Sequence, residues 1–226
     1  MKILILSIVA VVFFLITALC RKWKNVPVLI AVTIAAAVNT NYTVAYEYRV
    51  GLGALILGVD SIVAFLYLYN VIIMCIEVDT KRAYSLCFNS VAAIVLAGVI
   101  ETSALTASHG ALTLETMVPF LFNFVSACGC MAAGLVAIYI ADRLKTKTKV
   151  CDYAIVLTTT LIGSIIHSAI FSLGYMIKYV DIFDNMNTYL GCICGGLVEK
   201  GILIILGIVT LLFARKVLKI KIERNS

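Results

Sequence analysis

Seven apolar runs, each long enough to cross a lipid bilayer, constrain the fold of this chain more than any other feature. About 20 apolar residues in an α-helix span the hydrocarbon core of a membrane. The runs lie at residues 3–20, 28–46, 52–78, 84–100, 118–141, 153–177 and 189–216. With 63% of its 226 residues hydrophobic and 13% charged, the chain does not have the composition of a soluble domain. We therefore predict an all-α integral membrane protein, a bundle of seven transmembrane helices.

The spacing of the runs predicts a single membrane domain over residues 1–226, because no polar linker divides them. It comprises an N-terminal helix with a basic loop (residues 1–25), a six-helix core (26–218) and a basic tail (219–226). The second to fourth and the fifth to seventh runs form triplets of opposite orientation, the arrangement of a 3+3 inverted repeat. More basic residues follow the first run than precede it, whereas the basic residues of a cleaved signal peptide precede its apolar stretch. We therefore expect the first run to be an uncleaved membrane anchor.

The basic residues predict how the helices are oriented. Segments 21–24, 81–82, 143–149 and 215–226 hold 14 of the 18 Lys and Arg residues. The positive-inside rule places such segments in the cytoplasm. The predicted localisation is a multi-pass protein of the inner (plasma) membrane with its N-terminus outside and its C-terminus cytoplasmic. This placement explains the net charge of +6 without a nucleic-acid partner.

Two charged residues, Glu199 and Lys200, lie near the middle of the last apolar run. An ionisable side chain at that depth costs roughly 2.5–3.5 kcal/mol on insertion scales, and it is retained where it meets a partner or a water-filled cavity. Gly191, Gly195 and Gly196 precede the pair at helical spacing, which favours close helix packing. A binding role and an internal salt bridge that only fixes packing both remain open.

Four other runs also carry polar or aromatic side chains on one helical face. For any single residue, a hydrogen bond across helices is a sufficient explanation. Five such faces together predict a polar cavity at mid-membrane that holds a flat, hydrogen-bonding solute beside aromatic rings. For His167, which lies on one of these faces, a proton relay and a structural role both remain open. The faces comprise Asn39, Tyr42 and Tyr46; Asp60, Tyr67, Asn70 and Met74; Asn123, Ser126 and Cys130; and Thr160, Ser164, His167, Ser168 and Phe171.

Recognisable catalytic motifs are missing from the sequence. It has no phosphate-binding GxxxxGK[ST], no HExxH zinc motif and no GxSxG nucleophile elbow. The eight cysteines include no CxxC pair and lie mostly in apolar runs, where cysteine behaves as a small hydrophobe. We therefore expect no enzymatic activity, no cofactor and no metal.

The order of these features resembles the queuosine-precursor transporters, also called vitamin-uptake transporters. These are six-span proteins of the bacterial inner membrane that import 7-deazaguanine bases. The resemblance covers roughly residues 27–218, and Asn41, Tyr42 and Lys200 match positions of the family. It is carried by NTNYTV (39–44), FLYLYNVIIMCIEVDTKRA (65–83), LIGSIIHSAIF (161–171) and VEKGILIIL (198–206).

The chain departs from the family at several polar positions. The aspartate of the third span falls on Asn70, and the Asn and Asp of the sixth span fall on Ser164 and His167. An aspartate four residues before the lysine becomes Gly196. Loss of these acidic positions implies a different base or vitamin, or another coupling scheme.

The resemblance implies a transporter that imports a small heteroaromatic solute, a queuosine precursor such as a 7-deazaguanine base or a vitamin-like molecule. The expected partners are this solute and the lipid bilayer, and a homo-oligomer is compatible with the sequence. A sensory or scaffold membrane domain with a separate partner chain is the main alternative, and an intramembrane enzyme is less favoured. The expected solute-binding residues are Asn41, Tyr42, Tyr67, Asn70, Ser164, His167, Glu199 and Lys200.

Overall fold

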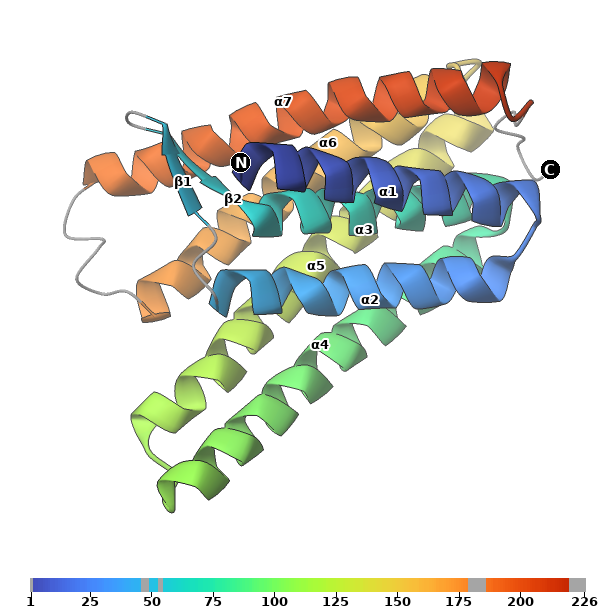
Figure 1. Cartoon of the computed structure of the whole chain (residues 1–226). Helices are drawn as coiled ribbons and strands as arrows, with labels where there is room; N and C mark the ends of the chain where they lie inside the picture. The colour runs from blue at the N-terminus through green and yellow to red at the C-terminus, as the bar shows by residue number, and fades with distance from the viewer. Residues whose placement is uncertain (1, 46–48, 53–54, 179–185, 220–226) are drawn as a thin grey trace.

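The computed structural model describes residues 2–45, 49–52, 55–178 and 186–219, with side chains mainly in 10–38, 64–171 and 200–219. The described chain forms a helical bundle, as predicted, in which successive helices run back and forth along its length (Figure 1). The helices are α1 (Lys2–Lys22), α2 (Val26–Ala45), α3 (Val59–Glu77), α4 (Thr80–His109), α5 (Leu114–Lys147), α6 (Asp152–Lys178) and α7 (Met186–Lys216).

The third apolar run is not helical from its start, so the expected helix over 52–78 is corrected here. Strands β1 (Arg49–Leu52) and β2 (Leu55–Gly58) pair antiparallel, with Arg49 opposite Gly58, and α3 begins only at Val59. Glycines at 51, 53 and 58 interrupt this part of the run. Glycine is a poor helix former, about 1 kcal/mol less favourable than alanine, so length and hydrophobicity alone gave the wrong start.

The connection between α4 and α5 is shorter than the gap between the fourth and fifth apolar runs. Segment 101–116, which contains this gap, is helical up to His109 and again from Leu114. Gly110, at φ 73°, ends α4 in the left-handed conformation that glycine adopts most easily. The Thr113 side chain caps the start of α5. Because α5 begins at Leu114, Pro119 lies inside the helix.

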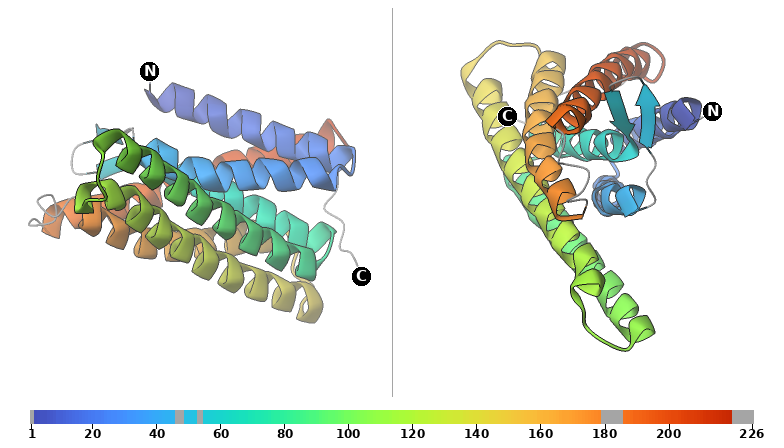
Figure 2. Two further views of the ribbon diagram at one scale, coloured as in Figure 1. Left: turned by 90° about the horizontal axis from the view of Figure 1, so that it is seen from below. Right: turned by 90° about the vertical axis from the view of Figure 1, so that its left-hand side faces the viewer.

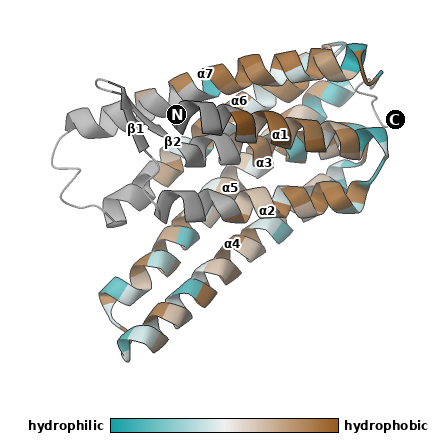
Figure 3. Cartoon of the chain, in the orientation of Figure 1, coloured by the Kyte–Doolittle hydropathy of each residue, from teal (hydrophilic) through white to brown (hydrophobic). Residues whose placement is uncertain are grey.

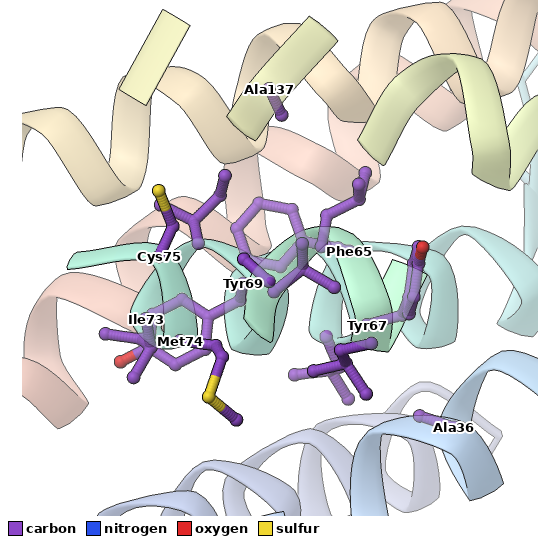
Figure 4. Packing of buried hydrophobic residues seen from close by; sticks show 14 of the residues in the cluster. Ala36, Phe65, Tyr67, Tyr69, Ile73, Met74, Cys75 and Ala137 are labelled. Atoms are coloured by element: carbon purple, nitrogen blue, oxygen red, sulfur yellow. The ribbon is translucent and has the colours of Figure 1, made fainter. Parts of the chain in front are cut away.

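Helix α3 is the centre of the bundle. Every residue from Ala64 to Ile76 is buried, and α3 contacts all six other helices. A helix that is apolar around its whole circumference is stable only when other elements cover every side. Figure 4 shows Tyr67, Ile73 and Met74 projecting from different sides of α3 into its neighbours.

The basic segments meet at one end of the bundle, which we call the basic end. The α1–α2, α3–α4 and α5–α6 connections and the end of α7 lie there, and α1 begins at the other end (Figures 1 and 2). Hydrophilic residues mark these connections, whereas the helices leading to them are largely hydrophobic (Figure 3). The shared location agrees with the charge pattern, and the orientation in a membrane stays a prediction.

Side-chain contacts tie four helices together at the basic end. Arg21 of α1 donates from Nε to Oε2 of Glu77 in α3 at 2.8 Å, and the two residues form a salt bridge. Thr80 of α4 donates to Asp142 of α5 at 2.7 Å. Lys145 of α5 donates to the carbonyl of Cys75 at 3.3 Å.

Three helices in the described part of the chain are long and apolar enough to cross a membrane: α4, α5 and the Asp152–Phe171 part of α6. Large apolar side chains are exposed on the outside of the bundle, among them Leu96 (59%), Ile100 (58%) and Ile205 (63%). An exposed apolar surface of this kind is expected of a membrane protein. Seven spans and an inverted repeat stay predictions.

The topology can be tested by cysteine labelling. With the native cysteines replaced by serine, Ala111→Cys should react in intact cells with a membrane-impermeant maleimide. Lys149→Cys should react only after the cells are opened, because its segment belongs to the basic end. Labelling of both positions in intact cells, or of neither, would contradict the predicted orientation.

Close helix packing at Gly134 of α5 can be tested by substitution. A Cβ at this position would lie 2.5 Å from the Cys87 sulfur and 3.2 Å from the Tyr67 hydroxyl. Gly134→Ala should therefore lower the free energy of unfolding by about 1–3 kcal/mol, the usual cost of overpacking. Gly201→Ala is the matched control, since no atom of the described residues lies within 4 Å of a Cβ there. Equal melting temperatures for the two variants in detergent would contradict this packing.

Candidate functional site

One face of α6 carries a row of buried polar groups without partners. Thr160, Ser164 and His167 recur at spacings that place them on one side of the helix, and each is at most 2% exposed. Among the described residues, the two hydroxyl oxygens and the Nε2 atom of His167 have no hydrogen-bond partner. The neighbouring Thr159 instead donates to the carbonyl of Ile155 at 2.6 Å. A buried polar group left unpaired costs about 1–3 kcal/mol, so this row needs an explanation other than stability.

Helix α5 forms the wall opposite this row. A Cβ at Gly129 would lie 3.4 Å from the Cδ2 atom of His167, so the glycine allows the imidazole to approach the α5 backbone. The imidazole stacks on Phe171, with ring centroids 5.2 Å apart and planes at 22°. Phe171 in turn meets Phe122 of α5 edge to face at 5.2 Å. Ser126, one turn along α5 from Phe122, is also buried with an unpartnered hydroxyl.

Lys200 supplies the positive charge of the site. Its side chain is fully buried near the middle of α7 and donates from Nζ to the hydroxyl of Ser168 on α6. His167 immediately precedes Ser168, the partner of Lys200, on α6. Helices α5, α6 and α7 thus bring together Ser126, Ser164, His167, Ser168 and Lys200, which we call the His167–Lys200 cluster.

Asn70 of α3, a predicted site residue, joins two other helices. It donates from Nδ2 to the Thr33 hydroxyl of α2 at 3.1 Å, and its Oδ1 accepts from Thr17 of α1 at 3.0 Å. The Thr33 hydroxyl in turn donates a hydrogen bond to the carbonyl of Leu29 at 2.6 Å. Both polar atoms of the Asn70 amide are therefore engaged by protein.

Tyr67, also on α3, contacts α4 and α5. Its hydroxyl donates to the sulfur of Cys87 at 3.2 Å. Neither Tyr67 nor Asn70 has a described contact with the His167–Lys200 cluster, so the structure joins three of the eight predicted residues: Ser164, His167 and Lys200. A solute-binding role for Tyr67 and Asn70 stays a prediction.

The side chains of Asn41, Tyr42 and Glu199 lie outside the described residues. Their backbone positions are in α2 and α7. Ser126 and Ser168 belong to the predicted polar faces but were not among the eight predicted site residues. Helical spacing was the available signal for both, and only the packing of α5, α6 and α7 selects them. In the described part of the chain, no group of three His, Cys, Asp or Glu side chains could hold a metal.

Comparisons of the chain with models of known protein families, with characterised proteins and with solved structures give no match. The resemblance to queuosine-precursor transporters consequently stays a prediction from the sequence.

Stability measurements can separate structural polar groups from those available to a ligand. Asn70→Ala should lower the free energy of unfolding by about 1–2 kcal/mol, because the Thr17 hydroxyl loses its acceptor inside the bundle. Ser164→Ala should leave the melting temperature in detergent unchanged or raised, since its hydroxyl has no protein partner to lose. A comparable loss of stability in both variants would show that Ser164 has a structural partner.

Proposed function

We propose that the protein is a membrane transporter that imports a small, planar, hydrogen-bonding solute through the His167–Lys200 cluster. The observation that carries the proposal is the set of buried, unpartnered polar atoms beside a buried lysine, near the middle of long apolar helices. Ionisable side chains at such depth typically mark substrate or ion pathways. A transported solute would supply the hydrogen bonds that the described residues leave unmade.

The chemistry of the cluster suggests what kind of solute it would bind. The Lys200 ammonium group is a donor only, so it suits a carbonyl or a ring nitrogen with a lone pair. The serine hydroxyls donate or accept at the edge of a ring, and His167 does either through its two nitrogens. The stacked rings of His167 and Phe171 provide a flat surface beside these groups. A heteroaromatic base with acceptor groups on its edge fits this combination.

The sequence resemblance supports the same class of solute, namely a 7-deazaguanine base or a vitamin-like molecule. The family's acidic positions would bind donor groups of such a base. Here His167 stands at one of these acidic positions and Ser164 at the family's nearby Asn, which favours a solute with more acceptors and fewer donors than the family's usual cargo. A sensory or scaffold domain has no comparable need for an unpartnered polar row deep in the bundle.

The proposal is tested by measuring ligand binding to the purified protein in detergent. The panel should include 7-deazaguanine bases, purines and heteroaromatic vitamins, with the rise in melting temperature as the first readout. Saturable binding of at least one planar compound, followed by its uptake into proteoliposomes, would support a transporter. Binding without uptake would favour a sensor, and chemical turnover of the compound would favour an enzyme.

The role of Lys200 is tested by Lys200→Met, which keeps the length of the side chain and removes its charge. Binding of the identified solute should fall about 10-fold or more, the scale of one charged hydrogen bond of ~1.5–3 kcal/mol. Membrane abundance should be unchanged or higher, because a buried charge is removed. Lys147→Met is the control, since Lys147 is exposed at the basic end of α5. Wild-type binding by Lys200→Met at normal abundance would exclude the lysine from the site.

A further inference from the structure

A second polar site lies within the α4–α5 hairpin, away from the basic end and one helical turn of α5 from Ser126 of the His167–Lys200 cluster. Asn123 of α5 is 2% exposed and donates from Nδ2 to Oε2 of Glu101 on α4 at 3.4 Å. The same Nδ2 donates to the carbonyl of Pro119 at 2.9 Å. Gly98 of α4 makes room for the amide, because a Cβ there would lie 2.7 Å from the Cβ of Asn123.

This arrangement leaves oxygen atoms without partners inside the hairpin. Both hydrogens of the Asn123 amide have acceptors, whereas its Oδ1 atom is buried and has no partner among the described residues. The hydroxyl oxygens of Thr102 and Thr106 are also buried and unpartnered there. Thr102 follows Gly98 by one helical turn, on the face of α4 that meets Asn123, and Thr106 lies a further turn away. Glu101 adds a carboxylate beside the oxygens of Asn123 and Thr102.

Glu101 is a carboxylate in otherwise apolar surroundings. The outer surface of the hairpin at this level is apolar, with Leu96, Ile100 and Phe124 each at least 50% exposed. In the part of the chain that the structure describes, the salt bridge present joins Arg21 to Glu77 at the basic end. No described basic side chain therefore balances Glu101, although carboxylates in apolar helices are normally paired or functional.

We infer that Glu101, Asn123 and Thr102 form a binding site for a monovalent cation, with Na⁺ the ion that fits. Hard cations take carboxylate, amide and hydroxyl oxygens as ligands. A single carboxylate among neutral oxygens matches one positive charge and is a weak ligand set for a divalent ion. The bound cation would satisfy the unpartnered oxygens of Asn123 and Thr102 and balance Glu101 in one step.

The position of the site connects it to the proposed solute cluster. Glu101 lies about 32 Å along α4 from Thr80 at ~1.5 Å per residue, toward the end of the bundle opposite the basic segments. Asn123 is one turn from Ser126 on α5, so one helix carries a residue of each site. A role as the coupling ion of uptake rests on the proposed function, whereas cation binding does not. The experiment therefore measures binding alone.

The test compares full-length purified protein in NaCl and in choline chloride at equal ionic strength. Na⁺ should raise the melting temperature of the wild type, because a ligand that binds only the folded state stabilises it. Saturable binding of ²²Na⁺ provides a second measurement. Glu101→Gln should abolish both responses while remaining folded, since the substitution keeps the shape of the side chain. Thr102→Val should weaken both responses with the carboxylate still present.

Glu115→Gln is the matched control, because Glu115 is an exposed carboxylate on the same hairpin. This variant should respond to Na⁺ as the wild type does. Equal stability of the wild type in both salts, or an unchanged Na⁺ response in Glu101→Gln, would overturn the proposal. Stabilisation by acid with no response to Na⁺ would overturn it as well, and would identify Glu101 as a proton site.

Discussion

The complete enclosure of α3 is the packing constraint on which the rest of the bundle depends. A helix buried from Ala64 to Ile76 has no side facing lipid or water, so its polar groups must bond to protein. Asn70 does so through α1 and α2, and Tyr67 does so through α4. Polar groups available to a ligand are consequently found on the helices that surround α3.

The structure separates buried polar residues into two kinds. The amide of Asn70 is matched by threonine hydroxyls and holds three helices in register. The groups on α6 that face α5 are not matched, although they are equally buried. Helix α5 approaches this row closely at Gly129, since a Cβ there would lie 3.4 Å from the Cδ2 atom of His167. A bundle that needed only stability would gain from apolar residues at Thr160 and Ser164, because unpaired polar atoms are costly.

The two ends of the bundle differ in how they are held. At the basic end, Arg21, Thr80 and Lys145 bond across helices and tie α1, α3, α4 and α5. At the other end, the α4–α5 hairpin extends away from the other helices (Figures 1 and 2). Opening the basic end would require these bonds to break, whereas the hairpin would have to separate from fewer neighbouring helices. Transport and cation binding, as proposed, would both act through α5, which reaches both ends.

The sequence by itself determined the helices, the gathering of basic segments at one end and the polar face of α6, because apolar length and helical spacing are local properties. It did not determine where α3 begins, since glycines interrupt an otherwise apolar run, nor that Pro119 lies inside α5, since the Thr113 cap starts that helix earlier. Only the tertiary structure decided which polar faces meet. Periodicity shows that Tyr67, Asn70 and His167 each lie on a polar face, but not which neighbouring helix covers it. Packing around α3 turned the first two toward α4 and toward α1 and α2, and left His167 beside Lys200.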